Sequence, residues 1–291
     1  MLEAGIQDLN VPASDGVRLH VRHRPGTRPP AFLLVHGLAS NARMWDEVTG
    51  RLAAENYPTY AVDLRGHGES DTPDEGHDTA TAASDVAAVG SALGLTGAVV
   101  AGHSWGGSVS LRLAAERPAL VAGLALIDGG WTDVAEPMTH RAEHWREQLS
   151  QRLASRGSTT VDETRNHLRN VHPGWSDGAI EACMADMRVG PDGLLSPRLS
   201  GPHFMSILES AWKERPHQWY PLVTVPVMLM PAIHDQSVAS EQHIREWVDS
   251  AEAALSHATV RWYVSADHYL QCEHPERIAN DLIDLAREVS P

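Results

Sequence analysis

Cysteine and basic residues are both scarce in this chain of 291 residues. Its two cysteines, Cys183 and Cys272, are too few for a disulfide scaffold or for a zinc site built from four cysteines. Lys and Arg total 23 against 38 Asp and Glu, which gives a formal net charge of −15. A nucleic-acid-binding protein would show a basic patch, and an anionic membrane surface would repel this charge. We therefore expect no nucleic-acid and no membrane partner.

Targeting and membrane-spanning segments are also missing from the pattern. The first ten residues, MLEAGIQDLN, lack the basic and apolar regions of a signal peptide. The longest apolar runs fall far short of the roughly 18 residues that a membrane span needs. The sequence therefore predicts a cytoplasmic location. No His-Glu-x-x-His motif occurs, and His140 and His144, which share one face of an expected helix, have no clear third ligand, so we expect no metal site.

What the chain does have is an alternation of apolar strands with helical patterns. Continuous apolar runs such as 31–35 and 98–101 are typical of strands buried on both faces of a parallel sheet. Strands separated by helices imply βαβ units, so the fold class is α/β. The expected strands are 6–11 and 17–21, which form a hairpin, then 31–35, 59–62, 98–101, 120–127, 225–230 and 259–264. The expected helices between and after them are 44–56, 79–93, 105–116, 241–254 and 275–289.

The alternation lapses between residues 132 and 220, a polar stretch rich in Arg and His. Its patterns predict three or four helices, at 138–154, 161–171, 177–188 and 203–214. After residue 220 the alternation of strands with helices resumes. We therefore expect one α/β domain made of residues 1–131 and 221–291, with residues 132–220 inserted as a helical unit.

The strongest local motif is Gly102-His103-Ser104-Trp105-Gly106-Gly107, which lies between an expected strand and an expected helix. Glycines two residues before and two after Ser104 allow a sharp turn that exposes the serine hydroxyl in a strained conformation. The free N–H groups at the start of the following helix favour negative charge. This context predicts a nucleophilic serine rather than a serine that caps the helix.

The order of several motifs resembles the α/β-hydrolase superfamily over nearly the whole chain. His36-Gly37 resembles the family's oxyanion-loop motif, the segment Asp63–Ser70 resembles its turn after the next strand, and Ser104 matches its nucleophile. The resemblance implies a mostly parallel sheet of eight strands, flanked by helices, with residues 132–220 as a helical cap. It also implies a serine hydrolase that needs no cofactor.

A serine nucleophile needs a general base, which in this superfamily is a histidine near the C-terminus. The histidines after residue 220 are His234, His243, His257, His268 and His274. His268 follows the last expected strand and resembles the family pattern, although Asp267 stands where a glycine is common. His274 precedes Pro275 and looks like the start of a helix. We therefore expect His268 to be the base.

Two aspartates satisfy the order expected for the triad's acid. Asp235 follows the strand 225–230, where the family usually places this residue, and its segment resembles the common motif more closely. Asp128 follows the strand 120–127, a position that some members use. The resemblance favours Asp235, with Asp128 as the alternative acid.

The remaining site residues are expected around this triad. The backbone N–H groups of Leu38 and Trp105 would form the oxyanion hole. Trp131, Tyr269 and His103 are the candidate pocket residues, since ligands of open α/β sheets bind outside the carboxyl ends of the strands. His36, and the turn residues Arg65 and His67, are interpreted as structural.

The expected triad and oxyanion hole imply acyl transfer from a small-molecule substrate to water. The first hypothesis is a carboxylic-ester or lactone hydrolase. Cleavage of a C–C bond, an amide or N-terminal proline, or a thioester would use the same triad, as would a cofactor-free perhydrolase resembling haloperoxidases. A catalytically silent binding protein is a further alternative, against which the intact triad weighs. Epoxide hydrolases and haloalkane dehalogenases are excluded by the serine, because their nucleophile is aspartate. The sequence does not give the oligomeric state.

Overall fold

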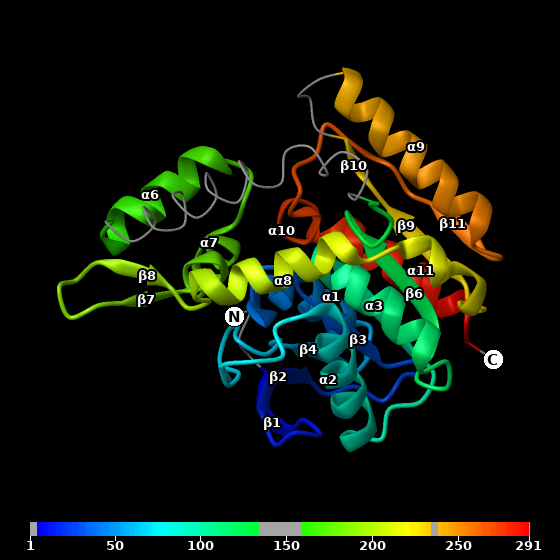
Figure 1. Cartoon of the computed structure of the whole chain (residues 1–291), viewed down its shortest axis with the longest axis horizontal. Helices are drawn as coiled ribbons and strands as arrows, with labels where there is room; N and C mark the ends of the chain where they lie inside the picture. The colour runs from blue at the N-terminus through cyan, green and yellow to red at the C-terminus, as the bar shows by residue number, and fades with distance from the viewer. Residues whose placement is uncertain (1–4, 134–158, 234–237, 291) are drawn as a thin grey trace.

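A computed structural model describes residues 5–133, 159–233 and 238–290. Its centre is a sheet of eight strands in the order β1-β2-β4-β3-β5-β6-β9-β11 (Figure 1). β2 pairs antiparallel with β1 and β4, and the other neighbours pair in parallel. The strands are β1 (Gln7–Pro12), β2 (Arg18–Arg24), β3 (Phe32–Val35), β4 (Thr59–Val62), β5 (Ala98–His103), β6 (Val121–Ile127), β9 (Val227–Met230) and β11 (Ala258–Val260). The predicted mostly parallel α/β fold with eight strands is confirmed.

Helices cover both faces of this sheet, which is why β3, β5 and β9 are buried at every position. Leu33 and Val35 of β3 point to one face and pack with α2, α3 and α9, whereas Phe32 and Leu34 point to the other and pack with α1 and α11. Each buried aliphatic side chain contributes about 1.5–3 kcal/mol relative to exposure. The helices are α1 (Asp46–Ala54), α2 (Thr79–Ala92), α3 (Trp105–Glu116), α9 (Val238–Ala254) and α11 (Pro275–Glu288), with the short helices η1 (Ala42–Trp45) before α1 and α10 (Leu270–Glu273) before α11.

The last predicted strand, 259–264, is divided in the structure. β11 ends at Val260, and β12 (Tyr263–Val264) pairs with β10 (Ala232–Ile233) in a separate two-stranded ladder. Pro231 separates β9 from β10, and its nitrogen carries no hydrogen to donate to a neighbouring strand. Its carbonyl still accepts the N–H of Tyr263, so the two ladders form a nearly continuous ribbon that leads into the segment holding His268.

Residues 159–220, called the cap segment below, lie in the chain between β6 and β9. They contain α6 (Val161–Val171), α7 (Asp177–Met184), the antiparallel hairpin β7 (Met187–Val189) and β8 (Leu195–Pro197), α8 (Gly201–Lys213) and the short helix η2 (Pro216–Gln218). A further short helix, η3 (Tyr220–Leu222), begins at the last residue of this segment. Figure 1 shows α6, α7 and the hairpin gathered on one side of the molecule, with α8 running from them back toward β6 and β9.

The helix predicted at 161–171 is confirmed. The one predicted at 203–214 begins two residues earlier, because Ser200 caps the helix by accepting the N–H of His203, and it ends one residue earlier, at Lys213. The prediction of a helix to residue 188 is wrong. α7 ends at Met184, and the chain enters the hairpin, where Gly193 adopts a φ of +77° in the turn. The helix predicted at 138–154, together with His140 and His144, lies outside the described residues. Among the helices that the structure describes, none is long and apolar enough to cross a membrane.

Candidate active site

Ser104 occupies a strained turn between β5 and α3. Its φ of +54° and ψ of −122° lie outside the regions that non-glycine residues ordinarily adopt. The neighbouring glycines permit this turn: a Cβ on Gly102 would lie 2.1 Å from the carbonyl oxygen of Gly106, and one on Gly106 would lie 2.4 Å from that of His36. The half-buried Ser104 therefore stands at the carboxyl end of the sheet, at the N-terminus of α3.

His268 and Asp128 form a close pair at the same end of the sheet. Nδ1 of His268 lies 2.5 Å from Oδ2 of Asp128, and the two side chains are 38% and 13% exposed. The other carboxylate oxygen of Asp128 accepts the N–H of Ala232 at 3.0 Å. Because the carboxylate only accepts, Nδ1 of His268 carries the proton of this bond, which leaves Nε2 able to take a proton from another group.

The partner of His268 is thus the alternative acid of the sequence analysis. Asp235, the residue favoured there, lies outside the described residues, so its position relative to His268 stays untested. Asp128 reaches the histidine because it follows β6, the neighbour of β5 in the sheet, and its φ of +43° turns the chain at once. A Cβ on the next residue, Gly129, would lie 2.3 Å from the carbonyl oxygen of Ser104, so this turn packs directly against the serine.

His103, predicted as a pocket residue, is buried and holds the backbone of His268. Its Nε2–H donates to the carbonyl oxygen of His268 at 2.8 Å, and the two rings lie 4.7 Å apart. Burial, and then the nearby His268, lower the pKa of His103 to about 3, so the ring stays neutral. The residue before Ser104 thereby holds the segment that carries the candidate base.

The loop after β3 lies against Ser104. A Cβ on Gly37 would be 3.0 Å from the Cβ of Ser104, so the backbone passes beside the serine as an oxyanion loop requires. His67 accepts the N–H of Ala39 at 3.2 Å, and His36 accepts the N–H of Leu64 at 3.0 Å. These two imidazoles connect the loop to the turn after β4, as their structural interpretation predicted. The expected donors, the N–H groups of Leu38 and Trp105, lie on this loop and in the first turn of α3.

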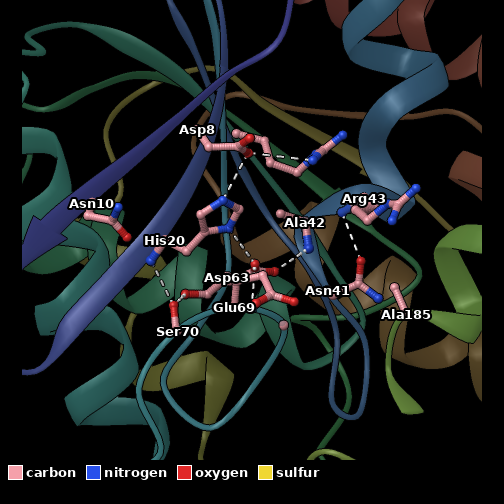
Figure 2. A network of polar contacts seen from close by, with 12 residues as sticks. Asp8, Asn10, His20, Asn41, Ala42, Arg43, Asp63, Glu69, Ser70 and Ala185 are labelled. Atoms are coloured by element: carbon pink, nitrogen blue, oxygen red, sulfur yellow. Dashed lines mark hydrogen bonds and ion pairs between the residues drawn. The ribbon is translucent and has the colours of Figure 1, made fainter. Parts of the chain in front are cut away.

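A buried ion pair fixes the other end of the same loop. Figure 2 shows Asp63, at the end of β4, between His20 of β2 and the start of η1. Oδ2 of Asp63 lies 2.7 Å from Nδ1 of His20, and its Oδ1 accepts the N–H of Ala42 at 2.6 Å. Asn41, beside Ala42, donates to the carbonyl oxygen of Ala182 in α7 at 2.8 Å. The network therefore joins the sheet, the loop after β3 and the cap segment.

A cavity of about 460 Å³ lies between the cap segment and the core. Ala39, on the loop after β3, and Tyr269, the residue after His268, both line this cavity, so it adjoins the candidate site. The predicted pocket residue Tyr269 lines this cavity. Trp131 does not; it is 4% exposed and packs in the hydrophobic cluster of α2, α3 and the sheet. Its role in substrate binding therefore remains a prediction.

His172 and Trp175, which also line the cavity, were missed as site residues. Their rings stack 3.9 Å apart, and Trp175 meets Tyr269 edge to face at 5.4 Å. The tryptophans of the cap segment carry no sequence signal that separates core packing from substrate contact, and His172 lies in no motif. In the described part of the chain, no group of three or more His, Cys, Asp or Glu side chains could hold a metal ion.

Several known proteins resemble this chain in sequence or in fold. N-formylmaleamate deformylase of Pseudomonas putida is 29% identical over 221 residues, which are 76% of this chain and 76% of that protein. An uncharacterized protein of Mycobacterium tuberculosis is 37% identical over 101 residues, which cover 35% of this chain but 29% of that protein. The crystal structure of E-2-(acetamidomethylene)succinate hydrolase has the same fold, with a TM-score of 0.77 over 96% of this chain and 98% of that one, at 24% identity.

The model of the alpha/beta hydrolase family matches residues 32–281, from β3 into α11. That range contains the strained serine turn, the loop after β3 and the His268–Asp128 pair. Because the match spans most of the sequence, the chain belongs to the alpha/beta hydrolase family.

Proposed function

We propose that this protein is a serine hydrolase that cleaves a carboxylic ester or lactone through an acyl-enzyme on Ser104, with His268 as base and Asp128 as acid. The observation that carries the proposal is the 2.5 Å contact between His268 and Asp128 at the sheet end that holds Ser104. The proton on Nδ1 faces Asp128, so Nε2 takes the proton of Ser104 as its oxygen attacks the carbonyl carbon. Asp128 orients the imidazole and stabilises its charged form.

The remaining steps use the same groups. The N–H groups of Leu38 and Trp105 hold the negative oxygen of the tetrahedral intermediate, an interaction that typically accelerates such reactions about 10²–10³-fold for each donor. His268 then protonates the leaving alcohol, and the acyl group remains on Ser104. Water enters, His268 takes its proton, and the acid product leaves with the serine restored.

Amide hydrolysis is the second candidate. It is favoured by the relative of which the chain covers 76%, a protein named for removing a formyl group from N-formylmaleamate. The steps are identical except that His268 protonates a leaving nitrogen. A panel of matched esters and amides distinguishes the two candidates by their kcat/KM.

The first test is hydrolysis of short and long p-nitrophenyl esters by the wild type and Ser104→Ala, together with labelling by a fluorophosphonate. We expect turnover and labelling in the wild type, and neither in the variant. A wild-type protein that is folded but shows no labelling and no turnover would overturn the proposal and favour a binding protein. Labelling without ester turnover would favour a narrower substrate on the same serine.

A further inference from the structure

The carboxylate of Asp267 connects the cap segment to the backbone of His268. Its Oδ2 lies 2.8 Å from Nδ1 of His172, the residue that follows α6 and caps its C-terminus. Its Oδ1 accepts the backbone N–H of His268 at 2.6 Å. One side chain thus binds the cap segment with one oxygen and the candidate base with the other. In the family pattern that this segment resembles, a glycine is common at the position of Asp267.

The backbone of residues 267–268 is held at two further points. The N–H of Asp267 donates to Glu273 of α10 at 2.5 Å, and the carbonyl of His268 accepts from His103 of β5. Both of these partners belong to the core. Of the three contacts, the one through the Asp267 side chain reaches the cap segment.

His172 is itself positioned by groups that line the cavity. Its ring stacks on Trp175 at 3.9 Å with an interplanar angle of 11°, and its side chain is 14% exposed. Trp175 in turn contacts Tyr269, the residue after His268, so the cap segment meets the same loop by a second route. A substrate that fills the cavity touches His172, Trp175 or Tyr269. The way in which a substrate packs against these rings therefore affects the position of His172, the residue that holds Asp267.

We propose that Asp267 is a positioning residue that couples the cap segment to the catalytic base, through His172 on one side and the N–H of His268 on the other. The inference rests on the proposed function, because it takes His268 as the base. Its consequence is that the cap segment affects the rate of the chemical step and not only substrate binding. A displacement of the base by about 1 Å can cost roughly 10²-fold in rate.

The test is a double-mutant cycle on Asp267 and His172. Asp267→Gly removes both contacts and is expected to lower kcat about 10–100-fold with a smaller change in KM. Asp267→Asn keeps an oxygen for the N–H of His268 and is expected to retain more activity. His172→Phe keeps a ring to stack on Trp175 but removes the donor, and is expected to lower kcat less than Asp267→Gly, because the hydrogen bond between Asp267 and the N–H of His268 remains.

Coupling requires that the two changes are not additive. The double variant Asp267→Gly with His172→Phe is expected to lose no more kcat than Asp267→Gly alone, because Asp267→Gly already removes the contact to His172. Additive losses, or a His172→Phe variant in which KM alone changes, would overturn the proposal. His257→Phe, an exposed histidine at the amino end of β11, is the matched control and is expected to behave as wild type.

A second readout does not depend on activity. Hydrogen exchange of the peptide that covers residues 265–270 reports the N–H of His268, which Asp267 protects. We expect faster exchange of this peptide in His172→Phe, although His172 lies in the cap segment, and no change in His257→Phe. Unchanged exchange in His172→Phe would disprove the coupling. If the wild type neither turns over esters nor reacts with fluorophosphonate, the proposed function fails, and this exchange still decides whether the coupling exists.

Discussion

His268 pairs with Asp128, although 140 positions separate the two residues in the chain. The contact forms because β6, which precedes Asp128, lies between β5 and β9 in the sheet. The carboxyl end of β6 therefore faces both the serine turn and the segment after β12. The hydrogen bond from the N–H of Ala232 holds the carboxylate in that position.

The pair makes a direct prediction about the two candidate acids. Asp128→Asn should lower kcat about 10⁴-fold, because an amide in this place favours the wrong tautomer of the histidine. Asp235→Asn should leave kcat within a few-fold of wild type. Steady-state hydrolysis of a p-nitrophenyl ester measures both. A collapse of activity in Asp235→Asn with Asp128→Asn active would return the assignment to Asp235.

The close approach of Gly37 to Ser104 predicts that a single methyl group disturbs the site. Gly37→Ala places a Cβ 3.0 Å from the Cβ of Ser104 and 3.1 Å from Nδ1 of His103, so the oxyanion loop must shift. We expect kcat to fall about 10–100-fold while the circular dichroism spectrum is unchanged. Gly174→Ala is the control, since its Cβ would meet no atom within 4 Å. Equal activity in both variants would argue against a role of this loop in catalysis.

The His20–Asp63 pair predicts how stability depends on pH. Burial opposes both charges, but the hydrogen bond between the two side chains prevails, so the pKa of His20 is raised from 6.5 and that of Asp63 is lowered from 3.8. The contribution of Asp63 is present above pH 3.8 and is lost as the pH falls through its folded pKa. The contribution of His20 is present below pH 6.5 and is lost as the pH rises through its folded pKa.

Urea unfolding of Asp63→Asn against wild type checks this between pH 3 and 9. The loss of unfolding free energy should be largest in the window between pH 3.8 and 6.5, and smaller on either side. Asp71→Asn serves as the control, because its ion pair with Arg18 is 46% exposed on both sides and should contribute roughly 0–1 kcal/mol. A difference that is constant with pH would show that Asp63 acts by packing alone.

A second buried pair, Arg65 with Asp85, gives a prediction on stability alone. The guanidinium donates to both carboxylate oxygens, at 2.6 and 2.7 Å, and the two side chains are 4% and 2% exposed. Arg65→Met leaves Asp85 buried without this partner and should cost about 3–5 kcal/mol of unfolding free energy. Adding Asp85→Leu should recover part of that loss. A double variant less stable than Arg65→Met would contradict this account of the pair.

The architecture could be predicted from the sequence because its signals are local. Alternating patterns on either side of a turn identified β1 and β2, apolar runs identified the other strands of the main sheet, and α3 and α6 begin and end at the predicted residues. The hairpin β7–β8 was missed because its strands are three residues each, too short for a period to appear. The glycines around Ser104 likewise predicted a sharp turn. A Cβ on Gly102 or Gly106 would lie 2.1 or 2.4 Å from a backbone carbonyl oxygen, so only glycine fits at these two positions.

The fold class, the serine turn and the short segment that contains His268 follow from local patterns in the sequence alone. The packing of distant segments brought Asp128 to His268, and it brought His172 of the cap segment to Asp267. Asp128 and Asp235 each follow a strand of the sheet and each lie between Ser104 and His268 in the chain. Residue type and chain order therefore do not distinguish the two candidate acids. The choice depends on the path of the backbone after each strand and on contacts between residues far apart in the chain. Such contacts leave no periodic or local pattern in the sequence.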